Sequence, residues 1–226
     1  MKIPNKFKQL VLEPLGVAAE PGAIMAIDIL VDTVLGTFAS GLYATKSSYQ
    51  FKQLEKNIRV AIEELCNRIE KLEQYITDEN KEIFENQLLP TFWDFVIEEK
   101  ESEKIQLFVN GLESTLTKEQ IDMEMMYVYF DTLKQMRIKD IMSFQDVFIN
   151  KNYKMIFKHI EGEFGESAIF EGENIAYHSY LKSKLITLGL IVLAVIDGNG
   201  TIDEHYSVTE LGKSLIKYFK KTEEDA

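Results

Sequence analysis

The last third of the chain, residues 175–220, constrains the fold more strongly than any other segment. It begins with the amphipathic stretch IAYHSYLKSKLITLGL, continues with β-prone segments at 190–196 and 202–208 around the sequence DGNG, and ends with TELGKSLIKYF. A Gly- and Asn-rich turn between two β-prone segments is typical of a hairpin. Gly189 suits the left-handed residue that ends a helix, and Thr209 suits the cap of the next one. The order helix, strand, strand, helix predicts the tail of a winged-helix module.

The residues ahead of this tail complete the expected module. Residues 137–149 carry apolar side chains at helical spacing and form a first helix. Residues 153–160 are expected to be a second helix or part of a loop, and the Gly- and Glu-rich segment 161–174 a loop that contains a short strand. We therefore predict a winged-helix-like domain over 135–222, followed by a frayed tail at 223–226.

Residues 1–134 are expected to form a helical domain. Only four prolines and twelve glycines occur among 226 residues, so long helices are favoured. From 43 to 76 apolar residues recur every three or four positions, which predicts an amphipathic helix of about nine turns. Arg68 lies on the apolar stripe, where a coiled coil prefers an apolar residue. The pattern leaves open whether the stripe packs within the chain or against a second copy.

Three further helices are expected in this domain. The first covers about 79–99, with Pro90 expected to kink or split it. The second covers 101–115. The sequence TKEQ at 117–120 matches a capping box and is expected to open the third, which ends near Leu133.

The most apolar segment of the chain, residues 22–43, has two interpretations. Asp28 and Asp32 lie four residues apart and so share one face of a helix. At the centre of a bilayer each would cost roughly 2.5–3.5 kcal/mol, which favours a buried helix with one wet edge. The alternative is a conditionally membrane-inserting or oligomerising segment, in which small residues such as Gly36 allow close contact between helices.

Composition bears on compartment and partners. The formal net charge of −12 disfavours binding to nucleic acid. The single cysteine, Cys66, cannot form an intramolecular disulfide, which fits a reducing compartment. The first residues lack the apolar core of a signal peptide. We therefore expect a cytoplasmic protein.

The sequence lacks the familiar signatures of catalysis. The three histidines, His159, His178 and His205, are too far apart in sequence for a typical metal-ligand spacing. Neither a phosphate-binding P-loop nor a G-x-S-x-G motif occurs. We expect no enzyme activity, no cofactor, no bound metal and no catalytic residues.

The helix before the expected hairpin is the candidate contact element. In winged-helix regulators this helix enters the major groove of DNA. Here it offers His178, Lys182 and Lys184, and many acidic residues lie in the flanking segments. Two lysines do not offset the negative potential of these acidic residues, since phosphate binding depends on several cations acting together. A protein-contact or structural role is therefore favoured over DNA reading.

Four segments carry a resemblance to a known family. They are the apolar PGAIMAIDILVDTVLGTFASG, the charged QLEKNIRVAIEELCNRIEKL, the stretch ESEKIQLFVNGLEST, and LITLGLIVL with YSVTELGKSLIKYF. Their order resembles the abortive-infection alpha family of bacterial and phage-borne proteins and its relatives, over most of the chain. The resemblance implies a role in limiting phage infection, and it brings no catalytic or cofactor-binding residues.

Together these patterns predict a mainly α protein with a C-terminal winged-helix-like domain. We expect a non-enzymatic interaction protein of bacterial or prophage origin, acting in phage–host conflict through a protein partner or as a homodimer. One alternative is a winged-helix transcription regulator that binds DNA. Another is a membrane-active effector that acts through residues 22–43.

Overall fold

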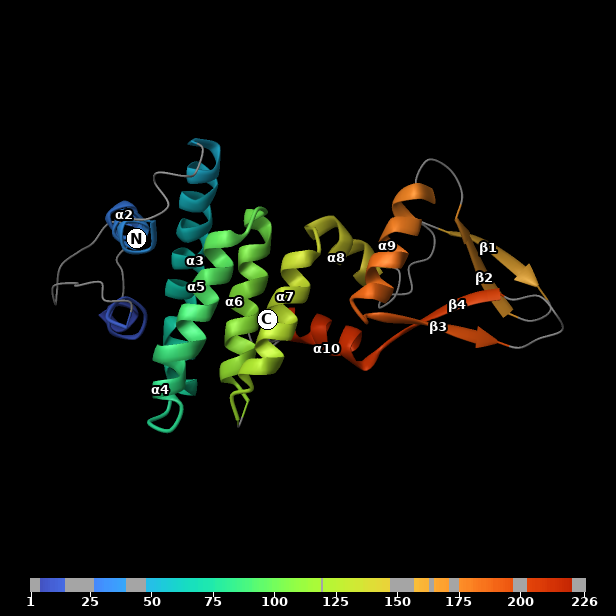
Figure 1. The fold of residues 1–226 in the computed structure, drawn as a ribbon. Helices are drawn as coiled ribbons and strands as arrows, with labels where there is room; N and C mark the ends of the chain where they lie inside the picture. Colours follow the sequence, from blue (N-terminus) through green and yellow to red (C-terminus); the bar gives the residue numbers. More distant parts are fainter. Residues whose placement is uncertain are drawn as a thin grey trace. The chain divides into compact units, whose positions relative to one another are not determined.

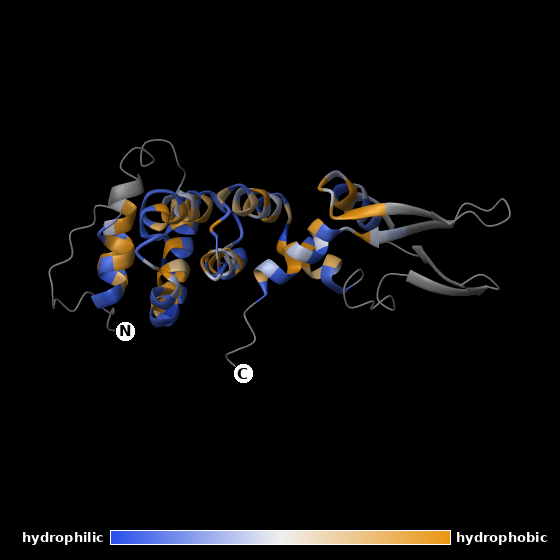
Figure 2. Cartoon of the chain, turned by 90° about the horizontal axis from the view of Figure 1, so that it is seen from below, coloured by the Kyte–Doolittle hydropathy of each residue, from blue (hydrophilic) through white to orange (hydrophobic). Residues whose placement is uncertain are grey.

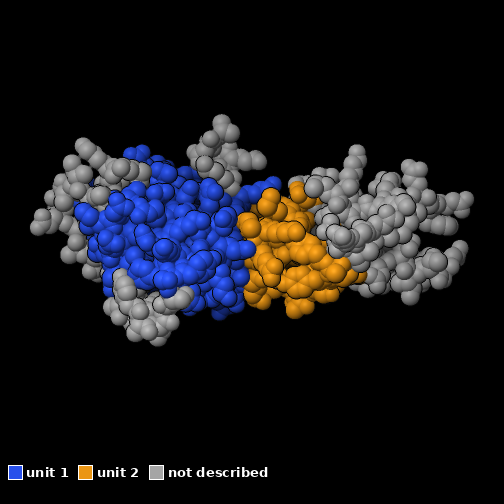
Figure 3. Space-filling view, turned by 90° about the horizontal axis from the view of Figure 1, so that it is seen from above, with its two compact units in different colours: residues 1–134, 219–226 blue, residues 135–218 orange. Residues whose placement is uncertain are grey.

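The computed structural model describes residues 5–14, 27–39, 48–118, 120–146, 157–162, 165–170, 175–196 and 203–220. These residues are mainly helical, as the sequence predicts. The chain forms two compact units (Figure 3). Unit 1 comprises residues 1–134 and 219–226, and unit 2 comprises residues 135–218.

Unit 1 is built from helices. In chain order they are α1 (Asn5–Phe7), the π-helical η1 (Lys8–Leu12), α2 (Ile27–Ala39), α3 (Ser48–Tyr75), α4 (Lys81–Ile83), the π-helical η2 (Phe84–Leu88), α5 (Leu89–Glu98), the 3-10 helix η3 (Ser102–Lys104), α6 (Ile105–Leu116) and α7 (Met123–Gln135), whose last residue counts with unit 2.

The 28-residue helix α3 lies at the centre of unit 1 and packs against α2, α5 and α6 (Figure 1). Its apolar stripe is covered within the chain. The stripe residues that are no more than 2% exposed are Leu54, Ile58, Ala61, Ile62, Leu65, Ile69 and Leu72. The predicted long helix is therefore confirmed from residue 48 to 75, and its expected start at 43 lies outside the described residues. The buried stripe needs no second copy to cover it.

Pro90 sits in the first turn of α5, directly after the π-helical turn η2. A proline has no N–H and its ring crowds the carbonyl four residues earlier. In η2 the backbone N–H of Leu89 bonds instead to the carbonyl of Phe84, five residues back. The expected kink or split at the proline is thus a wide turn between two helical segments.

The capping box predicted at 117–120 is wrong. Thr117 lies at the C-terminal end of α6, where its hydroxyl donates to the carbonyl oxygen of Ser114 at 3.0 Å. The next helix begins at Met123, and the carboxylate of Asp122 accepts the N–H of Met125 at 3.0 Å. Asp122 satisfies an otherwise unpaired helix N–H, which is the function that the sequence pattern assigned to Thr117.

An aromatic cluster fills the core between α5, α6 and α7, where apolar residues line the facing sides of the helices (Figure 2). The ring centroid of Phe108 lies 5.0 Å from that of Phe130, and Phe95 lies 5.3 Å from Phe130 in an edge-to-face arrangement. Phe219, which belongs to unit 1, adds a ring 6.3 Å from Phe130. The carbonyl oxygen of Phe219 accepts a hydrogen bond from Asn110 Nδ2 at 2.7 Å. Unit 1 is thus completed by a residue from near the end of the sequence.

Unit 2 mixes helices with two antiparallel pairs of strands. Its elements are α8 (Ile138–Phe144), β1 (Phe157–Gly162), β2 (Gly165–Phe170), α9 (Ile175–Thr187), β3 (Ile191–Ile196), β4 (Asp203–Val208) and α10 (Glu210–Phe219), whose last residue counts with unit 1. Strand β1 pairs with β2, and β3 pairs with β4 in the register that sets Ile191 opposite Val208.

The order α9, β3, β4, α10 confirms the predicted order of elements in the tail. Gly189 has a φ of 69°, in the left-handed region, as expected of the residue after a helix. The hydroxyl of Thr209 accepts the N–H of Gly212 at 3.0 Å, as expected of a cap. The expected turn at 197–202 lies outside the described residues.

The prediction for residues 153–160 is wrong where the structure describes them. Residues 157–160 belong to β1 rather than to a helix or a loop. They pair with residues 167–170, where a short strand was expected. Because the partner strand supplies the backbone hydrogen bonds, tertiary pairing decides the conformation of a segment whose own pattern is ambiguous.

Gly212 marks a close approach between α10 and the start of β3. A Cβ atom at this position would lie 2.4 Å from the carbonyl oxygen of Leu190 and 2.9 Å from Val208 Cγ1. We predict that Gly212→Ala lowers the free energy of unfolding by about 1–3 kcal/mol, because the backbone must move to admit the methyl group. Urea denaturation followed by circular dichroism measures the change.

The matched control is Gly36→Ala in α2. A Cβ atom at Gly36 meets nothing within 4 Å, and the position is exposed. Alanine favours a helix over glycine by about 1 kcal/mol, so this variant should be unchanged or slightly more stable. Equal losses in the two variants would contradict the close approach at Gly212.

Candidate functional site

The structure does not gather His178, Lys182 and Lys184 into one surface. His178 is only 6% exposed and lies on the buried side of α9. The Lys182 ammonium lies 5.0 Å from the ring centroid of Tyr206 in β4. Lys184 reaches the other way, to Asp140 in α8. The two lysines thus border α9 on different sides.

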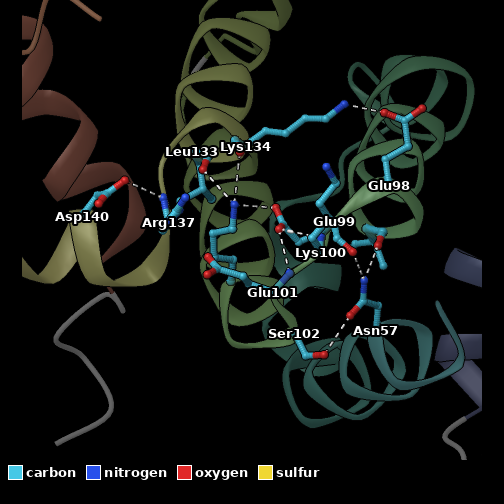
Figure 4. Close-up of polar contacts among 12 residues, drawn as sticks. Asn57, Glu98, Glu99, Lys100, Glu101, Ser102, Leu133, Lys134, Arg137 and Asp140 are labelled. Atoms are coloured by element: carbon cyan, nitrogen blue, oxygen red, sulfur yellow. Dashed lines mark hydrogen bonds and ion pairs between the residues drawn. The ribbon is translucent and has the colours of Figure 1, made fainter. Parts of the chain in front are cut away.

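Lys184 belongs to a buried polar cluster that joins α8 to α9. Its Nζ lies 2.9 Å from Asp140 Oδ2 and 3.2 Å from the hydroxyl of Tyr180. The other carboxylate oxygen of Asp140 accepts the hydroxyl of Tyr177 at 2.8 Å. The backbone N–H of Arg137 also donates to Asp140, at 3.1 Å, at the start of α8 (Figure 4). The side chain of Asp140 is fully buried, so the Lys184 ammonium, the Tyr177 hydroxyl and the Arg137 N–H replace its hydration.

The cluster shifts the pKa values of its members. Burial alone would raise the pKa of Asp140, but the bonds from Lys184, from the Arg137 N–H and from Tyr177 lower it below its usual value. Burial would lower the pKa of Lys184, and the bond to Asp140 raises it overall. Burial raises the pKa of Tyr177 to about 12, and the bond to Asp140 acts in the same direction. At neutral pH the pair is therefore charged and Tyr177 keeps its proton.

We predict that Asp140 contributes to the acid sensitivity of the fold. Its folded-state pKa lies below the unfolded value of about 3.9, so the unfolded chain takes up this proton first. The contribution of Asp140 to stability is complete above that value and is lost as the pH falls through the folded-state pKa. Urea denaturation over a series of pH values should show a shallower acid slope for Asp140→Asn than for the wild type.

A matched control is available on α7. Asp131 is exposed, so Asp131→Asn should leave the acid slope close to that of the wild type. If the Asp140→Asn and wild-type curves run parallel through the acid range, the carboxylate does not carry this contribution.

His178 lies next to the same cluster. Burial lowers its pKa, and the positive charge of Lys139 lowers it further. Its ring meets that of Tyr177 edge to face, with the centroids 5.6 Å apart. The imidazole is therefore neutral at neutral pH.

The exposed face of α9 carries no charged residue. The members of this face, all exposed, are Ala176, Ser179, Tyr180, Ser183, Ile186 and Thr187. They recur at intervals of three and four residues, which places them on one side of the helix. Tyr180 and Ile186 are its large members, at 48% and 42% exposure. This is an uncharged surface in a chain with 27% charged residues. We call it the α9 face.

Unit 1 contains a buried polar network that the sequence did not indicate (Figure 4). Asn57 of α3 donates through Nδ2 to the carbonyl oxygens of Val96 and Glu99, at 3.0 and 2.7 Å. Its Oδ1 accepts the hydroxyl of Ser102 at 3.0 Å and the amide of Gln53 at 3.0 Å. Asn57 thereby satisfies the carbonyl groups at the end of α5, which have no partner within the helix.

A buried ion pair adjoins this network. Lys104 Nζ lies 2.7 Å from Glu99 Oε2, and the two side chains are 2% and 3% exposed. The same ammonium donates to the carbonyl oxygens of Leu133 and Lys134 at 3.2 and 3.3 Å. These carbonyls lie at the negative end of the α7 dipole, which favours a cation. Lys104 thus joins the corner before α6 to the end of α7.

The second buried ionic cluster surrounds Arg68. Its guanidinium contacts Asn110 Oδ1 at 2.6 Å, Glu113 Oε2 at 3.0 Å and Glu64 Oε2 at 2.8 Å. Lys71 reaches the other oxygen of Glu113 at 3.0 Å. The cation on the stripe of α3 therefore has its partners in α6 and on α3 itself, within one chain.

Sequence reasoning gave no role to Asn57, Lys104 or Asp140. The available signal for Asn57 was a polar residue between the apolar positions Leu54 and Ile58 of one stripe. Lys104 and Asp140 stand among other charged residues, and nothing in their local pattern separates a buried charge from a solvated one.

Asp28, Asp32 and Gly36 lie on the exposed side of α2. The apolar side, with Leu30 and Val34 fully buried, contributes to the core against α3. The carboxylate of Asp28 forms an ion pair with the guanidinium of Arg59 of α3, at 2.8 Å. Among the described residues, no helix has the length and apolar character needed to cross a bilayer.

Cys66 is buried on α3. Burial raises the pKa of its thiol to about 12, and the nearby Glu63 acts in the same direction. The thiol therefore stays protonated at neutral pH. Across the described segments, no group of three or more His, Cys, Asp or Glu side chains is placed to hold a metal ion.

The strongest candidate site is thus a surface of unit 2 formed by the α9 face and its bordering lysines. Comparison with protein-family models, curated proteins and solved structures finds no match to this chain.

Proposed function

We propose that this chain is a non-enzymatic interaction protein of bacterial or phage origin that acts in phage–host conflict. Unit 2, with its order of elements, is taken as a winged-helix-like module that contacts another protein. The observation that supports this proposal most directly is the uncharged α9 face. Apolar and hydroxyl-bearing groups at the centre of a contact, with charges at its edge, are typical of protein interfaces.

The same face argues against DNA reading by α9. A helix in the major groove needs exposed side chains that reach phosphates and base edges, and cations dominate the phosphate contacts. The large exposed groups of α9 are Tyr180 and Ile186, and the charge of Lys184 is matched by that of Asp140. The Lys182 ammonium lies 5.0 Å from the ring centroid of Tyr206, on another side of the helix.

The distribution of charge between the units refines this argument. Unit 1 contains 16 Lys and Arg against 26 Asp and Glu, and unit 2 contains nine against eleven. Most of the net negative charge therefore belongs to unit 1. Repulsion of phosphates is weaker at unit 2 than the charge of the whole chain suggests, so the composition of the α9 face carries more weight than net charge.

Expression in a phage-sensitive bacterial strain tests the proposed function. We expect the wild-type protein to reduce plaque formation or to arrest host growth after infection. A variant with Ser183→Glu and Ile186→Glu on the α9 face should lose the effect at equal expression. Lys217→Glu, an exposed change on α10, is the control and should keep it. A wild type without effect on a diverse set of phages would contradict the proposal.

The second candidate, a DNA-binding regulator, rests on the order helix, strand, strand, helix in residues 175–219. A mobility-shift assay with duplex DNA tests it. Lys182→Glu is the informative variant, because Lys184→Glu would also break the bond between α8 and α9. Salt-sensitive binding that Lys182→Glu abolishes would favour this candidate over a protein contact.

A further inference from the structure

The Lys184 ammonium lies at the edge of the α9 face. Its Nζ is 3.2 Å from the hydroxyl of Tyr180 and 5.4 Å from the centroid of the same ring. Positions 180, 184 and 187 lie four and three residues apart, so they share one side of the helix. The Lys184 side chain is 17% exposed, whereas that of Asp140 is fully buried. A partner that covers Tyr180 therefore also covers this ammonium.

Asp140 decides the charge that such a partner meets. Its Oδ2 lies 2.9 Å from Lys184 Nζ, and the carboxylate is held in place by the Tyr177 hydroxyl at 2.8 Å and by the Arg137 N–H at 3.1 Å. The carboxylate belongs to α8 and has no exposed surface, so it neutralises the lysine without adding a group to the α9 face. The edge of the face next to Tyr180 is therefore uncharged overall.

We infer that Asp140 is a positioning residue that sets the selectivity of the α9 face: acting through Lys184, it keeps the face from binding phosphate groups. Nucleic acid and other polyanions are the partners that it excludes, and an uncharged protein surface is the partner that it permits. This inference rests on the proposed function, and it explains how the same face is reserved for a protein.

The physical reason lies in the different cost of covering a paired and an unpaired ammonium. An uncharged protein surface that covers an unpaired ammonium removes its hydration without compensation, whereas a cation with a buried carboxylate partner is already compensated. A phosphate backbone has the opposite preference. It gains affinity from each free cation that replaces a condensed counterion, and it gains little from a neutral pair.

The same ion pair also joins α8 to α9, and the Asp140→Asn variant separates that structural role from selectivity. Asparagine is close in size to aspartate, and its side-chain oxygen still accepts hydrogen bonds, so the change is mainly one of charge. Lys184 then carries an unmatched charge on a flexible four-carbon stem, which lets the ammonium reach a phosphate beside Tyr180.

Titration of labelled duplex DNA with purified protein, followed by fluorescence anisotropy over a series of salt concentrations, tests the inference. Asp140→Asn should bind DNA more tightly than the wild type, on the order of tenfold at about 50 mM salt, because one more cation contacts a phosphate. For the same reason, the slope of log K against log salt should become steeper by about 0.9.

Two controls identify the cation that is responsible. The double variant Asp140→Asn with Lys184→Met has the net charge of the wild type and lacks the ammonium, so it should bind DNA as the wild type does. Asp131→Asn, at an exposed position on α7, makes the same change of net charge elsewhere and should leave the salt slope unchanged. Circular dichroism should show that all variants are folded.

Two results would overturn the inference. The first is equal DNA binding by the wild type and Asp140→Asn. The second is a gain that persists in the double variant, because a loosened joint between α8 and α9 rather than the Lys184 charge would then be the cause. These measurements use no phage. If the wild type limits infection and Asp140→Asn gains no DNA binding, the inference alone fails. If Asp140→Asn gains DNA binding and the wild type has no effect on phage, the proposed function alone fails.

Discussion

Replacing Lys104 with methionine is expected to lower the free energy of unfolding by about 3–5 kcal/mol, the usual cost of removing one partner from a buried ion pair. Methionine fills a similar volume, so the loss reflects charge rather than a cavity. Without the ammonium, the Glu99 carboxylate stays buried with only the N–H groups of Lys100 and Glu101 bonded to one oxygen. The carbonyl groups of Leu133 and Lys134 lose a donor as well. Urea denaturation at neutral pH measures the change.

Two controls separate the buried charge from charge in general. Lys134→Met removes a lysine that pairs with Glu98 at the surface (Figure 4), where such pairs contribute at most about 1 kcal/mol. The double variant Lys104→Met with Glu99→Leu removes both buried charges and should recover much of the loss. A Lys104→Met protein that is as stable as Lys134→Met would show that the ion pair is not buried.

Arg68→Met should cost less, about 2–3 kcal/mol, although Arg68 makes more bonds than Lys104. The reason lies in the partners that remain. Glu113 keeps Lys71, and Glu64 is a quarter exposed and can be hydrated. The side-chain oxygen of Asn110 loses the hydrogen bond that it accepts from Arg68, but Asn110 Nδ2 still donates to the carbonyl oxygen of Phe219. Urea denaturation of the two methionine variants, under identical conditions, gives the comparison.

The companion variant for Arg68 is Arg59→Met. Arg59 lies on the same helix and pairs with the exposed Asp28, so its loss should stay below about 1 kcal/mol. The expected order of cost is Lys104, then Arg68, then Arg59. If Arg68→Met lost more stability than Lys104→Met, Lys71 would not be compensating the charge of Glu113, and water would not be compensating that of Glu64.

The tail and the long helix show what local sequence can predict. The spacing of apolar residues in α3, the left-handed Gly189 and the cap at Thr209 all depend on neighbours a few positions away, and these predictions are confirmed. The strand at 157–162 depends on a partner strand, and the local pattern did not indicate it. The predicted start of α7 was wrong by a few residues because the TKEQ pattern pointed to Thr117, whereas Asp122, five residues later, accepts the helix N–H of Met125.

The candidate site was harder to predict than the fold. His178, Lys182 and Lys184 were chosen because they occupy one helix, but a helix presents its residues on all sides. The positions of Lys184 and Asp140 are set by a contact between residues 44 apart in sequence. The uncharged character of the α9 face follows from the sequence alone once its exposed side is known. The sequence does not show which side of α9 is exposed, because the packing of α9 against its neighbours decides this.

Phe219 gives unit 1 a dependence on the order in which the protein is made. A ribosome synthesises α3, α6 and α7 first, then all of unit 2, and only then the residue whose carbonyl bonds to Asn110, 109 positions earlier. Until that residue emerges, the Asn110 amide lacks this acceptor and the ring of Phe130 lacks one neighbour. The first unit to be translated is therefore the last to be finished, and a ribosome that stalls within unit 2 leaves both units incomplete.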